Sequence, residues 1–189
     1  MPTPRVFPVT ILTTTRHTLR PLTPGDLDDF HAIWGDPRVI WWGASTTREE
    51  SAERLAGFLE RTAGRHGLGW WLAVLDATGE VVGDVALDPS PLPGGEIEIG
   101  WHFKREHWGY GHATEAAAAA RDHAFAVGID PLVATIVPEN TRSVALAERL
   151  GMRPRPGTFV RAGLDHRVWE IRAPDRGVTP RRTGPSGGR

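Results

Sequence analysis

Cysteine is absent from this 189-residue chain, and lysine and tyrosine occur once each, as Lys104 and Tyr110. The absence of cysteine excludes disulfide bonds, a catalytic thiol and any zinc site that uses cysteine ligands. No apolar run approaches the ~20 residues of a membrane-spanning helix, so we expect no membrane partner. The opening residues, Met1 to Arg5, carry no apolar stretch of the kind found in secretory signals, and we therefore expect a cytoplasmic protein.

Strong charge of either sign is also missing, because the formal net charge is -1. Hydrophobic residues make up 40% of the chain, which is enough for one globular core. The basic residues gathered in 173–189 leave the remainder mildly acidic, so a nucleic-acid partner is not expected. We predict a Pro/Thr-rich lead-in (1–14), a single domain (15–172) and a disordered Arg/Gly/Pro-rich tail (173–189).

Hydrophobic periodicity predicts alternating strands and helices. Helix starts are indicated by Thr23 with Pro24 and Asp26, and by Thr47 with a glutamate three residues later, Glu50. The predicted helices are 24–34, 47–61, 112–127 and 140–150. The predicted strands are 18–22, 70–75, 81–87, 96–103, 132–137, 158–160 and 168–172. This order predicts a mixed α/β fold.

A glycine-containing turn joins the strand 96–103 to the helix 112–127. With the next strand, 132–137, these segments predict a parallel βαβ unit with a right-handed crossover. The turn, Trp108-Gly-Tyr-Gly-His-Ala113, then lies at the amino end of a helix, where anions bind. Its glycines allow backbone N–H groups to face a pyrophosphate, although a plain tight turn explains the same residues. No Walker lysine follows, and the glycine spacing of a dinucleotide fingerprint is incomplete.

A second motif follows one strand later, with Asn140 and Ser143 at its start and Glu-Arg-Leu-Gly-Met152 at its end. Together the two motifs resemble those of the GNAT superfamily of acetyl-coenzyme A-dependent N-acetyltransferases, Gln/Arg-x-x-Gly-x-Gly/Ala and Asn-x-x-Ser…Glu-Lys-x-Gly-Phe. The chain is most similar to the RimJ/RimL branch, in which a tryptophan often stands at the place of Trp108. The resemblance runs from about Arg16 to Arg172.

The resemblance implies a GNAT fold, a central and mostly antiparallel mixed sheet flanked by helices. Acetyl-CoA would lie in a cleft between two splayed parallel strands, here 96–103 and 132–137, with its pyrophosphate on the backbone of the glycine turn. Lys104 and Arg105 are candidates to supply positive charge that Trp108 does not, or they belong to a solvated loop. The implied cofactor-binding residues are Trp101, His102, Phe103, Trp108, Gly109, Tyr110, Gly111, His112, Ala113, Asn140 and Ser143.

The implied reaction is direct transfer, in which a neutral amine attacks the thioester and CoA leaves as the thiol. It needs a base, donors for the oxyanion and a proton for the thiolate. Alternation places Glu98 and His102 on the polar face of strand 96–103. Glu98 matches a glutamate of many relatives and is the first candidate base, and His102 is the second. Ser143 is the candidate acid, since Ala147 stands where many relatives carry a tyrosine. A solvated strand face and a helix cap are the ordinary alternatives for Glu98 and Ser143.

The predicted helices 24–34 and 47–61 and the loop between them are expected to wall the acceptor site. That loop contains Trp41 and Trp42, which we take with Glu98 as candidate substrate-binding residues. Aromatic faces suit a cationic or apolar acceptor, although core packing also explains tryptophans. The candidate acceptors are a protein N-terminal amine and a small-molecule amine.

The eight histidines show no metal-ligand spacing, so no metal is expected. A homodimer is expected from the resemblance and from the eight tryptophans. Two other function classes remain open. One is a regulatory module that binds acyl-CoA but has lost catalysis, and the other is a nucleotide-binding module.

Overall fold

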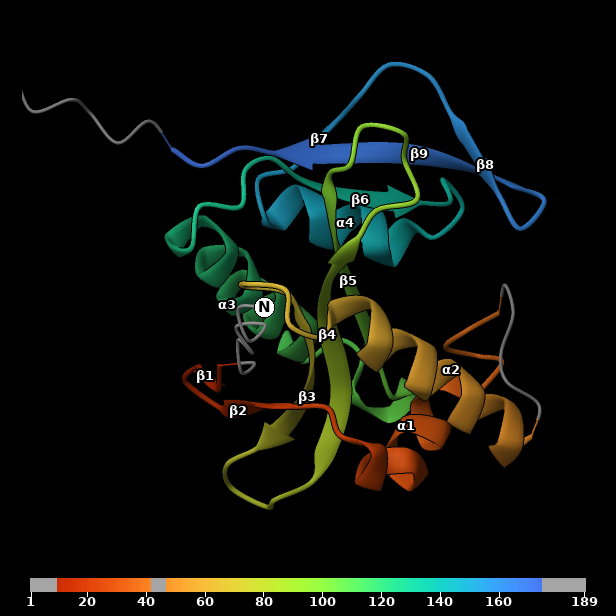
Figure 1. The fold of residues 1–189 in the computed structure, drawn as a ribbon, viewed down its shortest axis with the longest axis vertical. Coiled ribbons are helices and arrows are strands. Elements are labelled where there is room, and N and C mark those ends of the chain that lie inside the picture. Colours follow the sequence, from red (N-terminus) through yellow and green to blue (C-terminus); the bar gives the residue numbers. More distant parts are fainter. Residues whose placement is uncertain (1–9, 42–46, 175–189) are drawn as a thin grey trace, which may run out of the picture.

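The computed structural model describes residues 10–41 and 47–174, and a single mixed sheet with helices on both faces makes up most of it (Figure 1). The strand order is β1-β2-β3-β4-β5-β6-β9-β7, and β8 pairs with β9. The strands are Leu12–Thr13 (β1), His17–Pro21 (β2), Gly69–Leu75 (β3), Val81–Pro89 (β4), Ile97–Phe103 (β5), Leu132–Ile136 (β6), Arg153–Pro154 (β7), Phe159–Arg161 (β8) and Leu164–Ile171 (β9).

The α-helices of the described residues are Leu27–Trp34 (α1), Arg48–Thr62 (α2), His112–Ala126 (α3) and Thr141–Arg149 (α4), and short 3-10 turns cover Pro24–Asp26 and Arg105–His107. The predicted start of α2 is confirmed. The Thr47 hydroxyl accepts from the Glu50 N–H (3.1 Å), and the Glu50 carboxylate accepts from the Thr47 N–H (3.3 Å). This reciprocal pair satisfies two donors that a helix start leaves open.

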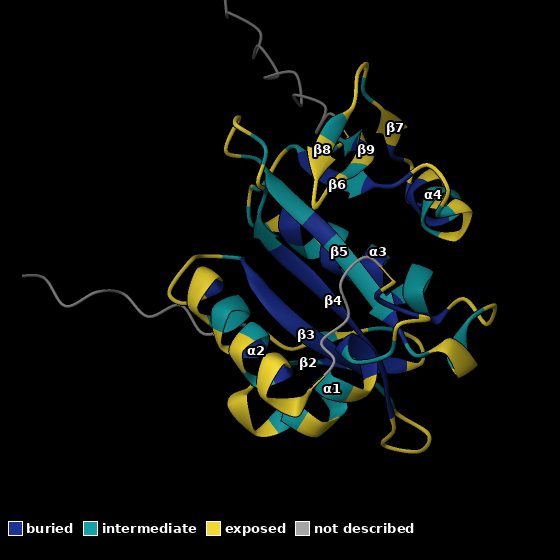
Figure 2. Ribbon diagram, turned by 90° about the vertical axis from the view of Figure 1, so that its right-hand side faces the viewer, coloured by how far each residue is buried: buried dark blue, intermediate teal, exposed yellow. Residues whose placement is uncertain are grey.

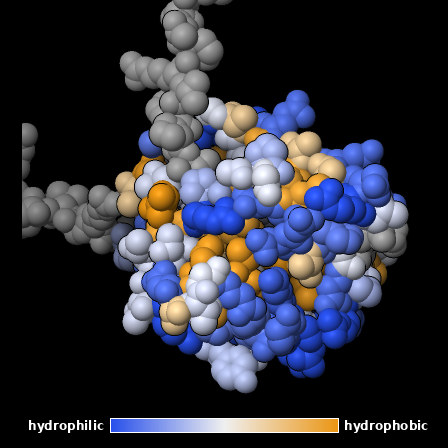
Figure 3. Space-filling view, turned by 90° about the horizontal axis from the view of Figure 1, so that it is seen from below, coloured by the Kyte–Doolittle hydropathy of each residue, from blue (hydrophilic) through white to orange (hydrophobic). Residues whose placement is uncertain are grey.

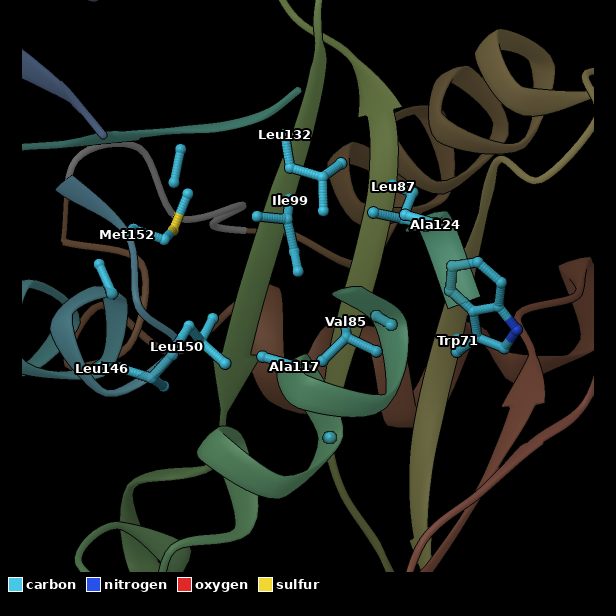
Figure 4. Close-up of a cluster of buried hydrophobic side chains, with 14 of the residues drawn as sticks. Trp71, Val85, Leu87, Ile99, Ala117, Ala124, Leu132, Leu146, Leu150 and Met152 are labelled. Carbon is cyan, nitrogen blue, oxygen red and sulfur yellow. The ribbon is translucent and has the colours of Figure 1, made fainter. Parts of the chain in front are cut away.

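Two hydrophobic cores lie on opposite faces of the sheet. One contains α3 and α4, whose side chains pack against β3, β4, β5 and β6, as Figure 4 shows for Ala117, Val85, Ile99 and Leu146. The other contains α1 and α2, whose Phe30 and other apolar residues pack against β3. Figure 2 shows α1 and α2 on one side of the sheet and α3 on the other, with the central strands buried between them.

The parallel pair of strands separates along its length. β5 and β6 are paired at Ile97 with Leu132 and at Glu98 with Val133, whereas β4 pairs with the whole of β5. Beyond these two pairs β6 continues beside β9 instead. The predicted fold class is confirmed, including the parallel βαβ unit, and so is the mostly antiparallel character of the sheet.

The closing hairpin differs from the expectation of strands at 158–160 and 168–172. β8 and β9 are joined by a two-residue turn, Ala162-Gly163, and β9 already begins at Leu164. Both turn residues have positive φ (52° and 75°), as the tight turns between twisted antiparallel strands require. Residues 164–167, which the predicted strand 168–172 leaves out, pair with β8 or β6. The short strands β1 and β7 were not predicted.

Polar side chains cover much of one face of the molecule (Figure 3). Figure 3 shows the molecule from below relative to Figure 1, with hydrophilic side chains over most of that face and hydrophobic ones between them.

Within residues 10–41 and 47–174, no helix is both long and apolar enough to span a bilayer. The same residues contain no group of three or more histidine, aspartate or glutamate side chains placed to hold a metal ion.

Candidate functional site

A cleft of about 210 Å³ lies where β5 and β6 separate. Its walls come from α1, α2 and β3 to β5 on one side and from β6 and α4 on the other, together with the β8–β9 hairpin. The lining residues are Trp34, Trp41, Arg54, Phe58, Arg61, Trp70, Ala86, Asp88, Glu98, Ile99, Gly100, Trp101, His102, Ala134, Thr135, Ile136, Val137, Asn140, Ser143, Arg161, Ala162 and His166.

Several residues predicted from the sequence meet in this cleft. They are Trp41, Glu98, Trp101, His102, Asn140 and Ser143. The Phe103 side chain is buried in the core with α3, and the residues from Trp108 to Ala113 lie outside the cleft, at the amino end of α3. Trp42 lies outside the described residues.

The backbone of β5 turns peptide groups toward the separation. The Lys104 N–H donates to the Val82 carbonyl on β4 (2.9 Å), and the Phe103 carbonyl accepts from the Trp108 indole (2.7 Å) on the other side. Because peptide directions alternate along a strand, the N–H and C=O of Trp101 also point away from β4. β6 has diverged at this level, so an extended ligand can pair with Trp101 as an added strand would.

Glu98 lies at the point where the two strands part. One carboxylate oxygen accepts from the Thr135 N–H (3.0 Å) and from the Thr135 hydroxyl, and the other accepts from Arg161 Nη1 (3.2 Å). In a continuous parallel sheet, the Thr135 N–H of β6 would donate to a backbone carbonyl of β5. Here it donates to the Glu98 side chain instead. Glu98 therefore stabilises the split and connects it to the β8–β9 hairpin.

His102 is held by a buried aspartate on the neighbouring strand. Its Nδ1 lies 2.9 Å from Asp84 Oδ1, and Asp84 Oδ2 accepts from the Trp34 indole N–H at 2.8 Å. The Asp84 side chain has no exposed surface, and a buried carboxylate is tolerated only when such partners are present. An aspartate at Nδ1 favours the tautomer in which Nδ1 carries the proton and Nε2 is the basic nitrogen.

Ser143 faces His102's strand from the first turn of α4. Its N–H donates to the Asn140 side-chain oxygen (3.2 Å), so Asn140 is the N-cap of the helix. Its hydroxyl accepts from the Trp101 indole N–H at 3.4 Å. The cap and the indole together fix the hydroxyl at the edge of the cleft.

Aromatic rings form the wall opposite α4. Phe58 and Trp70 stack with centroids 4.0 Å apart, and Trp34 contacts both rings edge-on. Asp88 follows on the same face, directly across from Glu98 in the β4–β5 register. Burial raises the pKa of Asp88, and the ion pair with Arg61 opposes that rise. This wall offers flat apolar surface with carboxylates at one end.

The glycine turn has the geometry of an anion site. Gly109 and Gly111 have φ of 87° and 80°, a region that favours glycine, and Gly111 is the N-cap of α3. The first N–H groups of a helix have no partner within the helix, so they are available to a ligand. The His112 side chain points elsewhere, with Nδ1 at 2.9 Å from Nε2 of the buried His17, and burial lowers the pKa of both rings.

An ion pair anchors this turn to the start of the chain. The Arg16 side chain donates to Glu115 (2.7 Å) and to the Tyr110 carbonyl (3.0 Å), while the Tyr110 side chain is exposed. Burial alone would raise the pKa of Glu115, but hydrogen bonds from Thr14 and Arg16 outweigh burial and lower it to about 2. The backbone of the turn is thereby held by a residue 94 positions away.

Residues 16–153 match the family profile for the acetyltransferase (GNAT) domain. The chain belongs to the GNAT acetyltransferase family. Membership confirms the family that the two motifs predicted, and it identifies this GNAT protein as an acyltransferase. The matched residues include the glycine turn and the cleft walls other than the β8–β9 hairpin.

Individual relatives agree with the assignment. The chain is 28% identical over 145 residues to the uncharacterized N-acetyltransferase p20 of Bacillus licheniformis, covering 75% of this chain and 82% of p20. It is 31% identical to an acetyltransferase from Agrobacterium tumefaciens strain C58, with a TM-score of 0.75 over 88% of this chain and 96% of that one.

The RimJ/RimL-like expectation is supported at the level of the fold. RimL, a ribosomal L7/L12 α-N-protein acetyltransferase solved in complex with coenzyme A, has a TM-score of 0.70 at 17% identity, covering 89% of this chain and 98% of RimL. At this identity the likeness shows a shared fold.

Several site residues of this GNAT domain were not found from the sequence, namely Trp34, Asp84, Thr135 and Arg161. A usable indication existed only for Asp84, because an aspartate within the apolar run Val81–Leu87 must have a buried partner. The partner itself, His102, lies 18 positions away and is set by the register of β4 and β5.

Proposed function

We propose that this protein is an acetyl-CoA-dependent N-acetyltransferase that moves an acetyl group directly to a primary amine, with residues 15–172 as its catalytic domain. The observation that carries the proposal is the cleft between β5 and β6, which has His102 on one wall and Ser143 on the other. The acceptor is a small-molecule amine or a protein N-terminal amine.

The residues present fit a coenzyme A thioester. The N–H groups at the start of α3 suit the pyrophosphate, and the Trp101 carbonyl, with Asn140 opposite, suits an amide N–H of the pantetheine arm. When bound, acetyl-CoA supplies the acetyl group in activated thioester form. RimL, which shares the fold, has been solved with coenzyme A, and this supports the same ligand here.

His102 is the base that the contacts favour. Asp84 orients its ring and leaves Nε2 as the nitrogen that accepts a proton from the amine. Glu98, the first candidate from its position in the motif, has its carboxylate engaged by Thr135 and Arg161. We therefore assign Glu98 to holding the split in the sheet and to shaping the acceptor end of the cleft.

The remaining two tasks are protonation of the thiolate and stabilisation of the oxyanion, and groups on either side of the cleft can perform them. The Ser143 hydroxyl, which accepts from Trp101, can donate its proton to the departing thiolate. The Trp101 N–H points away from β4 and can donate to the oxyanion. A thiol has a pKa near 8.5 and leaves readily, so the demand on Ser143 is modest.

The acceptor amine would enter beside the rings of Trp34, Phe58 and Trp70. These faces suit an apolar or cationic group next to the amine. Trp41, which is 46% exposed at the mouth of the cleft, extends the same surface outward.

The direct test combines a thermal shift with free-thiol release, using acetyl-CoA and a panel of N-terminal peptides, polyamines, amino acids and aminoglycosides. We expect acetyl-CoA to raise the melting temperature. We also expect one acceptor class to give steady thiol release, at a rate that doubles when the enzyme concentration is doubled. Stabilisation without release on any acceptor would point to a regulatory module instead. Stabilisation by ATP but by no CoA species would point to a nucleotide-binding module.

A further inference from the structure

Two buried polar atoms of the cleft residues have no hydrogen-bond partner among the described residues. They are the indole nitrogen of Trp70 and Oδ1 of Asp88. Trp70 is 6% exposed, and the Asp88 side chain is 14% exposed. The same part of the chain has two further atoms of this kind, on Glu96 and Trp169, but neither residue lines the cleft. A buried donor or acceptor without a partner is costly, and a ligand that supplies the partner removes that cost.

The open oxygen of Asp88 follows from the way Arg61 binds the carboxylate. Arg61 donates from Nε (3.0 Å) and from Nη2 (2.5 Å), and both bonds end on Oδ2. Glu98, directly across from Asp88 in the β4–β5 register, differs. One of its oxygens accepts from Thr135 and the other from Arg161. Asp88 is therefore the carboxylate of this pair that keeps an oxygen for a ligand.

The two open atoms belong to neighbouring positions on one face of the sheet. Trp70 on β3 pairs with Ala86 on β4, and Asp88 follows Ala86 by two residues. Trp70 and Asp88 are therefore diagonal neighbours, with backbones roughly 7–8 Å apart, a separation that large side chains bridge. A donor beside an acceptor suits a ligand group that accepts and donates at once, as an alcohol hydroxyl does.

The surrounding charges favour such a neutral group over a second ammonium on the acceptor. Asp88 already pairs with Arg61, and Glu98 already pairs with Arg161. Arg54 adds a further positive charge to the lining of the cleft. A second ammonium would be repelled by these guanidinium groups, and it has no lone pair to accept from the indole N–H.

Strand register sets the distance between this pair and the base. The cross-strand row of Trp70 continues through β4 to Gly100 on β5, and Asp88 lies opposite Glu98. These β5 positions are two and four residues from His102. At about 3.3 Å per residue, a group held between the two rows lies roughly 10 Å from the amine at His102.

We propose that Trp70 and Asp88 bind a hydroxyl group of the acceptor, so that the substrate is a hydroxyl-bearing amine with roughly 10 Å between the two groups. The inference rests on the proposed function and names the acceptor class within it. The hydroxyl accepts from the Trp70 N–H and donates to Asp88 Oδ1, which gives both atoms a partner.

Linear amino alcohols, compared with alkylamines of the same carbon number, test the proposal. In an extended chain three bonds span about 3.8 Å, so chains of about six to eight carbons reach the hydroxyl site from His102. At these lengths we expect kcat/KM to be roughly tenfold higher for the amino alcohol, because the hydrogen bond to a carboxylate is charge-assisted. Shorter amino alcohols and α,ω-diamines of equal length should show no such gain over the alkylamine.

Variants locate the effect. Trp70→Phe removes the N–H and keeps an aromatic ring, and Asp88→Asn replaces the carboxylate with a weaker acceptor, so both should lower the ratio of the two kcat/KM values several-fold. Trp169→Phe is the matched control, because its buried indole also lacks a partner among the described residues but lies outside the cleft. It should keep the ratio of the parent. The ratio compares two amines on one preparation, so it does not depend on the folded fraction.

Equal kcat/KM values for amino alcohols and alkylamines at every length would overturn the inference and leave the proposed function in place. The same holds for a larger gain with diamines, for a ratio unchanged in both cleft variants, and for thiol release with peptides but with no hydroxyl-bearing amine. If no amine gives thiol release, the proposed function is wrong as well.

Discussion

The two faces of the sheet are built from different residues. On the α3 and α4 face the buried helix residues are mainly alanines, Ala116, Ala117, Ala120 and Ala124, so the helix backbone lies close to the strands. On the α1 and α2 face the apolar helix residues are large instead, with Phe30, Ile33 and Trp34 on α1 and Leu55 and the partly buried Phe58 on α2.

This difference matches what each face is proposed to bind. A helix that packs closely through alanines brings its amino end to the edge of β5, where backbone N–H groups can receive a phosphate. A wall of large rings instead offers shaped side-chain surface, which suits an acceptor that varies between enzymes. On this proposal, cofactor binding depends on backbone conformation and acceptor binding depends on individual side chains.

The largest effect on turnover is expected at His102, which contacts Trp34 and Trp70 on the α1 and α2 face. We expect His102→Gln to lower kcat by about 100-fold or more, because a general base contributes roughly that much, while the KM for acetyl-CoA changes less than about twofold. Steady-state thiol release with the best acceptor measures both. His107→Gln is the matched control, since His107 pairs with Glu80 and does not line the cleft. An unchanged kcat in His102→Gln would remove His102 from the mechanism.

On the α3 and α4 face, we expect the backbone conformation of the glycine turn to determine how tightly acetyl-CoA binds. We expect Gly109→Ala to raise the KM for acetyl-CoA about tenfold, because alanine at a φ of 87° costs about 1–2 kcal/mol and the loop shifts to relieve it. Gly79→Ala is the control, since Gly79 has a φ of 74° in the β3–β4 turn and a Cβ there meets no atom within 4 Å. Equal KM values for the two variants would argue against the glycine turn as the phosphate loop.

A smaller effect on turnover is expected at Ser143, which lies at the edge of the cleft in the first turn of α4. We expect Ser143→Ala to lower kcat several-fold or more without abolishing acetyl-CoA binding, because the thiolate is a good leaving group and leaves without a strong acid. Ser143→Thr, which keeps a hydroxyl, should recover part of the rate. Turnover of Ser143→Ala equal to that of the parent would show that no proton is required from this residue.

The smallest effect concerns stability, at the ion pair that anchors the glycine turn. The pKa of Glu115 is about 2 in the folded protein, below its ordinary value near 4.5, so its ionised form stabilises the fold above pH 4.5. Since Arg16 is 42% exposed, we discount the effect to about 1 kcal/mol.

Urea unfolding of Glu115→Gln measures this effect. The variant should be less stable at pH 7, and the difference should shrink as the pH falls from 4.5 toward 2. Glu139→Gln, an exposed site, provides the comparison. A difference that does not depend on pH would show that packing, and not the charge of Glu115, holds the turn.

The turn before α3 and the start of α4, which we propose to hold the cofactor, could be located from the sequence because their determinants are contiguous. Residues 108–113 and 140–152 carry their motifs within a single turn or helix, and the alternation along β5 correctly predicted that Ile99 and Phe103 belong to the core under α3. Local conformation and helix ends depend on near neighbours in the chain, which periodicity and capping rules describe directly.

The side-chain pairings around the proposed acceptor site were decided by tertiary structure. The β4–β5 register joins Asp84 to His102, and packing of α1 on the sheet brings the Trp34 indole to the same carboxylate from 50 positions away. In the same way, the tight β8–β9 turn carries Arg161 to Glu98 across 63 positions. Local patterns contain no information about such pairings, because they follow from strand register and helix packing, which bring together side chains distant in the chain.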